Sequence, residues 1–220
     1  MTSTIEVFNA GFPGDTTVEL LKRFHRSAAE KQPDVVLLLI GSNDMFYPGH
    51  ILEIETYRQN LNALLDRINN IDSECILFTA PRFLPELLVE NYPATLEHPL
   101  SLEQRLEAVN TVIRNTADER NINLIDLYSL IDPVDDSIDS LIMNPANSGR
   151  RDGMHLTAAG TRIMARAAAE MIRQYFPQAE KIVCLGDSIT YGVYLRGKGT
   201  ANIDAETYPG LLGKLLSCTV

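Results

Sequence analysis

The feature that most limits how this chain can fold is the alternation of short, mostly apolar runs with longer segments of helical periodicity. The apolar runs are strand-sized and span residues 5–8, 35–40, 75–78, 122–127 and 181–185. Each precedes a segment whose apolar residues recur every three or four positions, at residues 17–30, 53–71, 102–120, 157–175 and 208–216. Strands that are apolar on both faces are buried on both faces, as in a parallel sheet flanked by helices. The pattern therefore predicts an α/β fold with a five-stranded parallel sheet between two layers of helices.

The length and composition of the chain agree with a single folded unit. The chain has 220 residues, of which 45% are hydrophobic. A chain of this size buries roughly 70% of its unfolded surface, so its core needs neither disulfides nor metals. The sequence contains no internal repeat, low-complexity tract or linker. We therefore expect one domain over residues 1–220.

The charge balance argues against two classes of partner. Lys and Arg number 19, whereas Asp and Glu number 29, which gives a net charge of −10. Nucleic-acid binding depends on Lys and Arg residues that neutralise phosphates, and docking on anionic lipid needs the same excess of positive charge. We therefore expect no nucleic-acid partner and no attachment to an anionic membrane surface.

The sequence shows neither a membrane span nor an export signal. No apolar run approaches the ~18 residues of a membrane helix, and residues 1–4 lack the pattern of a signal peptide. The cysteines, Cys75, Cys184 and Cys218, lie far apart and have no metal-ligand spacing. Cys75 and Cys184 fall in apolar runs, so we interpret them as small buried hydrophobes in a reducing compartment. We expect a cytoplasmic protein.

The loops that follow the apolar runs carry the functional information, because ligands of parallel sheets bind outside the carboxyl ends of the strands. The loop after the last run reads Gly186-Asp187-Ser188-Ile189-Thr190-Tyr191-Gly192. A serine here can present its hydroxyl at the mouth of the sheet, although Thr190 replaces the final glycine of the G-x-S-x-G nucleophile motif. The alternative is a glycine-flanked turn in which Asp187 and Ser188 bind the local backbone.

Two further loops offer hydrogen-bond donors. The loop after the first run contains Gly11 and Gly14 just before a helix, where backbone N–H groups and the helix dipole favour negative charge. Its alternative is an ordinary turn in which Asp15 or Thr16 caps the helix. The loop after the second run reads Gly41-Ser42-Asn43-Asp44, and Asn43 can offer a side-chain N–H to a developing oxyanion. Asn and Asp are also common in plain turns.

A fourth segment, Asp152-Gly153-Met154-His155, lies just before the helical segment 157–175, for which Thr157 is the expected N-cap. A tight turn can bring the Asp152 carboxylate within hydrogen-bond distance of the His155 imidazole, which fixes its tautomer and stabilises its charged form. The alternative is an exposed acid and an exposed histidine near a helix start. Together, the four segments supply a nucleophile, a base, an orienting acid and oxyanion donors, which favours a hydrolase.

These four segments resemble the sequence blocks of the SGNH (GDSL) hydrolase family of esterases and lipases. The resemblance implies a flavodoxin-like three-layer α/β/α sandwich, with Ser188 as the nucleophile and Asp152 and His155 completing a catalytic triad. It implies an oxyanion hole formed by the backbone N–H groups of Ser188 and Gly14 and by the side chain of Asn43. The other glycine of the Gly14 loop stays open as an alternative. The resemblance implies no metal and no organic cofactor.

The order of the blocks differs from that of the family. In the family the serine block opens the chain, whereas here it lies near the C-terminus, so the sequence resembles a circularly permuted member. Residues 178–220 then correspond to the family's usual N-terminal strand and helix. If the strands keep their places, residues 181–185 lie between residues 5–8 and 35–40. Residues 217–220 then lie near residues 1–5, away from the catalytic rim.

The resemblance implies a serine-dependent carboxylic-ester hydrolase that acts on small or medium acyl esters through an acyl-enzyme intermediate. We expect a small-molecule ester as substrate, while assembly into a homo-oligomer stays open. Acetylated sugars, lysophospholipids and thioesters all fit, and residues 83–99 either wall an acyl pocket or pack on the core. One rival is a non-catalytic flavodoxin-like module that binds a phosphorylated ligand. Another is a metal-dependent hydrolase using Asp152, His155 and His50; neither rival has its characteristic motif.

Overall fold

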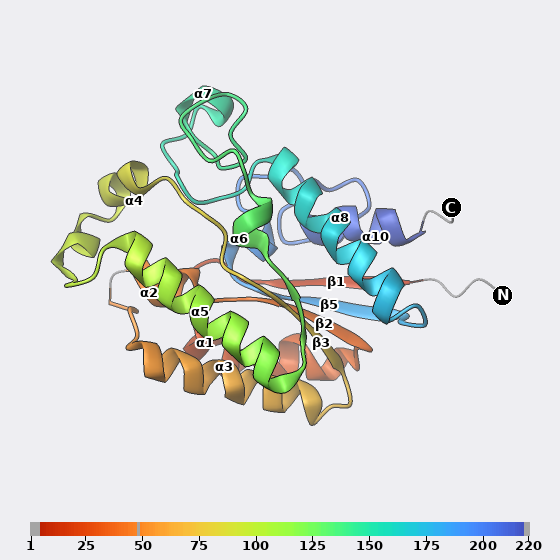
Figure 1. Cartoon of the computed structure of the whole chain (residues 1–220). Helices are drawn as coiled ribbons and strands as arrows, with labels where there is room; N and C mark the ends of the chain where they lie inside the picture. The colour runs from red at the N-terminus through yellow and green to blue at the C-terminus, as the bar shows by residue number, and fades with distance from the viewer. Residues whose placement is uncertain (1–4, 48, 218–220) are drawn as a thin grey trace.

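The computed structural model describes residues 5–47 and 49–217 (Figure 1). Its strands are β1 (Glu6–Gly11), β2 (Val35–Leu39), β3 (Glu74–Phe78), β4 (Asn123–Ile125) and β5 (Lys181–Gly186), paired in parallel in the order β1-β5-β2-β3-β4. The long helices, each following one strand in the sequence, are α1 (Thr17–Ser27), α3 (Ile54–Asn69), α5 (Leu102–Arg120), α8 (Ala158–Tyr175) and α10 (Tyr208–Ser217). The predicted α/β fold with a five-stranded parallel sheet is confirmed.

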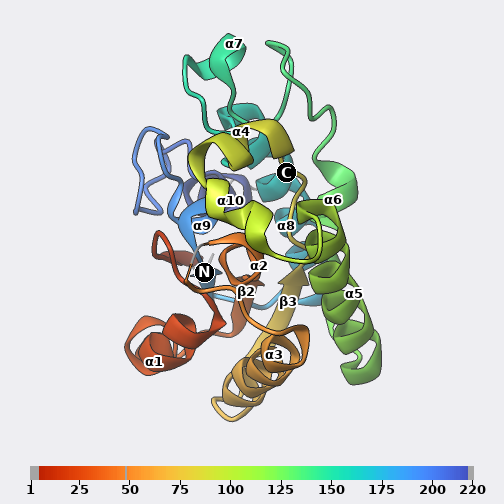
Figure 2. The same ribbon diagram turned by 90° about the vertical axis from the view of Figure 1, so that its left-hand side faces the viewer.

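Helices cover both faces of the sheet (Figure 2). Successive side chains of a strand point to opposite faces, so each face of the sheet presents its own set of apolar residues. Val36 and Leu38 of β2 pack with apolar residues of α1, α3 and α5. Val35, Leu37 and Leu39 pack instead with apolar residues of α8 and α10. All five side chains are buried. Strand β2 therefore serves two cores at once, which explains why its sequence is apolar throughout.

The strand that comes last in the sequence lies between two strands from the N-terminal part of the chain. Ile182 of β5 is opposite Val7 of β1 on one side and opposite Val35 of β2 on the other. The predicted position of residues 181–185 is thereby confirmed. Helix α10 packs beside β1, and a Cβ built on Gly213 lies 3.6 Å from the Val7 side chain. Residues 1–4 and 218–220, which the sequence predicts to be close together, lie outside the described residues.

The helices begin at polar side chains that satisfy their first N–H groups. Thr16 is the N-cap of α1, and its hydroxyl accepts a hydrogen bond from the Val18 N–H. Thr157 caps α8 as predicted, accepting a hydrogen bond from the Gly160 N–H at 3.2 Å. The predicted helix over residues 17–30 is too long. Helix α1 ends at Ser27 because Ala28 leaves the helical conformation, and a 3-10 turn, η1 (Ala29–Lys31), follows.

Short helices occur where the sequence predicts loops. Ser188 begins α9 (Ser188–Tyr191), and Asn43 lies in α2 (Ser42–Phe46). Asp187 caps α9 by accepting a hydrogen bond from the Ile189 N–H at 2.9 Å. Four more short helices are α4 (Pro85–Asn91), the 3-10 helix η2 (Pro93–Glu97), α6 (Leu127–Leu130) and α7 (Pro145–Ser148). These elements are too short to leave a periodic apolar pattern, so sequence periodicity does not reveal them.

Two of the cysteines pack as apolar groups. Cys184 is buried and Cys75 is partly buried, and burial raises the pKa of each thiol to about 12. Cys218 lies outside the described residues. None of the described helices combines the length and the apolar character that crossing a bilayer requires.

Candidate active site

The predicted site residues gather at the carboxyl edge of the sheet. Ser188 follows β5, Gly14 follows β1, and Asn43 follows β2. One small cavity is lined jointly by direct sequence neighbours of the predicted residues, namely Ser42, Met154 and Ile189. The tertiary structure therefore brings the segments that carry Asn43, His155 and Ser188 to one place.

Asp152 and His155 form the predicted pair. The Asp152 Oδ2 atom lies 2.7 Å from the His155 Nδ1 atom, and Oδ1 accepts hydrogen bonds from the Met154 and His155 backbone N–H groups at 2.9 and 2.6 Å. Burial alone would raise the pKa of Asp152, but the hydrogen bonds and the charge of His155 outweigh it and lower the pKa below its ordinary value. Asp152 is therefore built to stay ionised and to orient the imidazole.

The turn between these two residues depends on Gly153. Its φ is +86°, a conformation that L side chains rarely adopt, and a Cβ at this position would lie 2.6 Å from the Leu87 Cβ atom. The Gly153 carbonyl accepts a hydrogen bond from the Leu84 N–H at 2.7 Å. The start of α4 thus holds the Asp152–His155 turn in place.

The second ring nitrogen of His155, Nε2, is free to form a hydrogen bond. This atom is buried and has no hydrogen-bond partner among the described residues. Ser188 is 6% exposed at the start of α9, and it makes no hydrogen bond to His155 in this structure. Nucleophile and base are often farther apart in a free enzyme than in its substrate complex, so this separation does not disqualify the pair.

Three hydrogen-bond donors lie on the segments near Ser188. The Asn43 side-chain amide donates one hydrogen bond, to the Asp15 carbonyl at 2.8 Å, and an amide nitrogen carries two hydrogens. Neither the Gly14 N–H nor the Ser188 N–H donates to another residue in the described part of the chain. The Gly11 N–H, in contrast, donates to the Asn9 side chain at 3.0 Å. The geometry therefore favours Gly14 over Gly11 as an oxyanion donor.

Gly11 has a different role, because it lets β1 approach the serine helix. A Cβ at Gly11 would lie 2.2 Å from the Tyr191 nitrogen and 2.8 Å from the Asp187 carbonyl oxygen. Any side chain at Gly11 would push β1 away from α9. Arg23 of α1 links the loop after β1 to the end of β5, since it forms an ion pair with Asp15 and donates to the Gly186 carbonyl at 2.9 Å.

Asp187, next to the predicted nucleophile Ser188, is an unusual carboxyl group. It is fully buried, its Oδ1 atom accepts the Ile189 N–H, and its Oδ2 atom has no partner among the described residues. Burial raises the pKa of Asp187 to about 7, while the Ile189 hydrogen bond and the charge of His155 act in the opposite direction.

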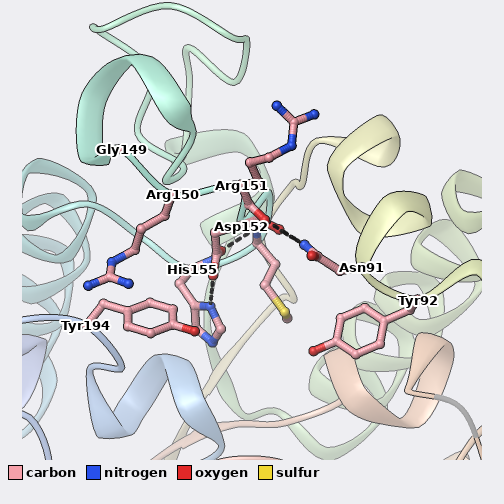
Figure 3. Close-up of a pocket in the computed structure, with 9 residues that line it drawn as sticks. Asn91, Tyr92, Gly149, Arg150, Arg151, Asp152, His155 and Tyr194 are labelled. Carbon is pink, nitrogen blue, oxygen red and sulfur yellow. Dashed lines mark hydrogen bonds and ion pairs between the residues drawn. The ribbon is translucent and has the colours of Figure 1, made fainter.

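A larger pocket opens on the side of His155 that faces solvent. Its volume is about 420 Å³, and its lining includes Tyr92, Arg150, Asp152, His155 and Tyr194. Figure 3 shows Tyr92 and Tyr194 on opposite sides of His155, with their hydroxyl ends turned toward the centre. The Tyr194 ring meets His155 edge-on, with ring centroids 5.6 Å apart. The pocket is thus polar, with aromatic walls.

The small cavity on the other side of the site is apolar and tight. Its volume is about 10 Å³, and its wall is formed by Ser42, Met45, Phe46, Pro81, Arg82, Phe83, Leu88, Met154 and Ile189. A space of that size holds roughly one water molecule. For Phe83 and Leu88 the alternative of packing on the core is confirmed, and the acyl-pocket alternative stays a prediction. Phe83 and Leu88 wall this cavity and also belong to the core, and Tyr92 lines the polar pocket.

Sequence reasoning missed the polar pocket. Tyr92, Arg150 and Tyr194 belong to three separate loops or element ends and fall in no motif. Tyr194 leaves one trace in the backbone, a φ of +67°, which sequence does not reveal for a tyrosine. In the described ranges, no three His, Cys, Asp or Glu side chains gather as metal ligands would, so the metal-dependent alternative finds no ligand set there.

A comparison with family sequence models decides the family. The model of the GDSL-like Lipase/Acylhydrolase family matches residues 2–163, about three quarters of the chain. The chain belongs to that family. The GDSL-like match contains Gly14, Asn43, Asp152 and His155 and ends before Ser188. It identifies the chain as a carboxylic-ester hydrolase and gives no support to the phosphate-binding module.

Solved structures with the same fold include GDSL-type acylhydrolases and esterases. A putative acylhydrolase from Bacteroides fragilis has a TM-score of 0.57 at 19% identity, covering 73% of this chain and 71% of its own. A GDSL-like lipase from Bacteroides thetaiotaomicron has a TM-score of 0.54 at 18% identity, covering 73% and 72%. An acetylxylan esterase from Geobacillus stearothermophilus has a TM-score of 0.53 at 21% identity, covering 72% and 68%. No individual curated protein matches the sequence.

Proposed function

We propose that this GDSL-family member hydrolyses short-chain acyl esters of polar alcohols through an acyl-enzyme intermediate on Ser188. The observation that carries the proposal is the His155 ring, held by Asp152 at Nδ1 and left with a buried, unpartnered Nε2 atom. The proposed triad is Ser188, His155 and Asp152, and the proposed oxyanion hole consists of Gly14, Ser188 and Asn43.

In the first half of the proposed reaction, Ser188 Oγ attacks the acyl carbon while His155 Nε2 takes the hydroxyl proton. Asp152 holds the ring and stabilises its positive charge. The developing oxyanion accepts hydrogen bonds from the N–H groups of Gly14 and Ser188 and from the Asn43 amide. The bond between the acyl carbon and the alcohol oxygen then breaks, and His155 gives its proton to the leaving alcohol.

In the second half, His155 takes a proton from a water molecule, which attacks the acyl carbon of the Ser188 ester. The tetrahedral intermediate collapses, the carboxylic acid leaves, and the proton on His155 returns to Ser188. No redox step or bound organic group is needed. We expect metal chelators to leave the rate unchanged.

The two cavities support a division of the substrate between acyl and alcohol parts. The tight apolar cavity between Ser42, Met154 and Ile189 suits the methyl group of an acetyl ester, because its free volume is about that of one water molecule. The polar pocket of about 420 Å³ beside His155 suits a larger, hydroxyl-rich alcohol. Long-chain lysophospholipids and fatty acyl thioesters fit this arrangement poorly.

The similar structures include acetylxylan esterases, whose substrates are acetylated sugars by name. At 20–21% identity they establish the fold and do not transfer a substrate. The proposal of an acetylated, sugar-like substrate therefore rests on the small cavity and the aromatic walls of the polar pocket, and the named esterases agree with it.

We further propose that residues 1–220 form one circularly permuted domain. Residues 178–220 would supply the strand and helix that usually begin the family's sequence. Two observations support this: β5 lies between β1 and β2, and the family match ends at residue 163.

Covalent labelling combined with a serine substitution tests the function. The wild-type enzyme should react with a fluorophosphonate probe and hydrolyse p-nitrophenyl acetate faster than the butyrate and octanoate esters. Ser188→Ala should abolish labelling and nearly all hydrolysis while its circular dichroism stays native. Ser137→Ala, at a serine on the 131–144 loop, is the matched control and should behave as wild type. Near wild-type turnover by Ser188→Ala would eliminate the serine mechanism, and a preference for octanoate would eliminate the short-acyl assignment.

A further inference from the structure

Arg150 is an arginine without an ion-pair partner on the wall of the polar pocket. Its guanidinium carbon lies 4.1 Å from the centroid of the Tyr194 ring, so the cation stacks on the aromatic face. Within residues 5–47 and 49–217, the ion pairs engage other arginines and do not include Arg150. In a chain of net charge −10, acidic side chains are abundant, yet none pairs with this one.

The neighbouring arginine shows the contrast. The Arg151 guanidinium forms an ion pair with Glu90, and its Nε and Nη2 groups both donate hydrogen bonds to that carboxylate. Figure 3 shows the Arg151 side chain directed away from His155, whereas Arg150 extends along the pocket toward Tyr194. Arg151 also lines the pocket, but its guanidinium is engaged by Glu90, whereas Arg150 has no ion-pair partner among the described residues and keeps its hydrogen-bond donors available.

The surface on which Arg150 stacks is held in a strained conformation. Tyr194 has a φ of +67°, which is unusual for a bulky side chain, and such strain persists where surrounding contacts impose it. The Leu195 N–H donates to the Gly192 carbonyl at 3.0 Å, and the Val193 N–H donates to the Ser188 carbonyl at 3.1 Å. The turn that follows α9 thus places the Tyr194 ring against His155, where its face also contacts the Arg150 guanidinium.

The pocket lies on the leaving-group side of the proposed reaction. It is lined by Asp152 and His155 and by none of the three proposed oxyanion donors. The histidine that gives a proton to the leaving alcohol must face the alcohol oxygen. A substituent of the alcohol therefore extends into the space between Tyr92, Tyr194 and Arg150.

We propose that Arg150 binds an oxyacid anion, a carboxylate or a phosphate, on the alcohol part of the ester. The inference rests on the proposed function and names its substrate class: a short-chain acyl ester of an acidic alcohol, such as an acetylated uronic acid or an acetylated sugar phosphate. The planar guanidinium can donate two parallel hydrogen bonds to either group, and its stacking on Tyr194 fixes its plane.

Matched aryl acetates test the proposal, because para-acetoxybenzoate and para-acetoxybenzamide have similar size and differ in charge. The anionic ester should have a kcat/KM at least about 10-fold above that of the neutral amide at low ionic strength, in line with one charge-assisted contact. Arg150→Gln should remove most of this preference, and Arg150→Lys should retain part of it. Comparing the preference between variants cancels the intrinsic reactivity of the two esters. A third ester, para-acetoxyphenyl phosphate, distinguishes the two anions. The preferred anion is the one whose kcat/KM falls more when Arg150 is replaced by Gln.

Arg151→Gln is the matched control, since it removes an equal charge at the next residue from a side chain already paired with Glu90. Its preference for the anionic ester should equal that of the wild type. A ratio of the two kcat/KM values that is the same in the wild type and in Arg150→Gln would overturn the proposal, as would a ratio that falls equally with Arg151→Gln. Failure of the proposed function looks different, because neither ester would then show hydrolysis that depends on Ser188.

Discussion

The Asp44 carboxylate accepts hydrogen bonds from both the backbone N–H and the hydroxyl of Thr17, at 2.9 and 2.5 Å. Both residues are buried. Thr17 begins α1, just after the loop that carries Gly14, and Asp44 directly follows Asn43 in α2. This contact therefore sets the spacing between two of the proposed oxyanion donors, which otherwise belong to separate loops.

Substitution of Asp44 should affect stability and catalysis together. Asp44→Ala leaves the Thr17 N–H and hydroxyl without an acceptor, and we expect it to lower the free energy of unfolding by about 3 kcal/mol. Asp44→Asn keeps an acceptor oxygen and should lose less. If the contact positions the oxyanion donors, kcat should fall more than KM rises in the alanine variant. Urea denaturation and steady-state kinetics measure the two effects, and an unchanged kcat in a destabilised protein would assign Asp44 a purely structural role.

The Asn43 amide should contribute to the transition state rather than to substrate binding. We expect Asn43→Ala to lower kcat by about 10²–10³-fold with little change in KM, because an oxyanion bond forms only as the carbonyl becomes tetrahedral. Steady-state kinetics on p-nitrophenyl acetate provides the readout. An effect confined to KM would make Asn43 a ground-state binding residue.

Asp187 should make the protein less stable as the pH rises. Its folded-state pKa is raised to about 7 by burial, above the ordinary value of 3.8 that applies in the unfolded chain. Between these values the folded state holds more protons than the unfolded state, so the free energy of unfolding falls as pH increases. Asp187→Asn removes this contribution, and its stability relative to wild type should improve from pH 4 to pH 8. Urea midpoints at the two pH values test this, and a constant difference would contradict it.

Tyr194 should show a conflict between stability and activity. Tyr194→Gly places the residue that best tolerates a φ of +67° at this position, so we expect an unchanged or higher melting temperature. The same substitution removes the ring that contacts His155 and supports Arg150, so kcat/KM should fall. Tyr194→Phe keeps the ring and should retain most activity. Calorimetry and ester hydrolysis test the pair; full activity in the glycine variant would remove Tyr194 from the site.

Reordering the chain tests the proposed permutation. A protein that starts at residue 178, runs through residue 220 into residue 1 and ends at residue 176 should fold and hydrolyse the same esters. The packing of α10 beside β1 makes the new junction short, and moving a loop opening changes the closure entropy only slowly. A folded but inactive product with intact Ser188, Asp152 and His155 would refute the assumed correspondence.

The sequence was sufficient for the order of the elements and for the proposed catalytic side chains. Apolar runs such as 35–40 and 181–185 predict buried parallel strands because each needs apolar cover on both faces. The Asp152–His155 contact was predictable because the two residues are three positions apart in one tight turn. Gly14 and Gly11 could not be distinguished in this way, since the choice depends on the Asn9 side chain, which occupies the Gly11 N–H.

Only the tertiary structure decided what surrounds the proposed triad. Residues 92, 150 and 194 meet at His155 although more than forty positions separate any two of them, and no local pattern records such a meeting. The unpartnered guanidinium of Arg150, the strained backbone of Tyr194 and the buried carboxyl of Asp187 arise from packing between distant segments. The local sequence therefore identified the proposed reactive groups, because each lies in a short motif, and the fold brought those motifs together. The shape and charge of the substrate pocket depend on long-range contacts, which exist only in the folded chain.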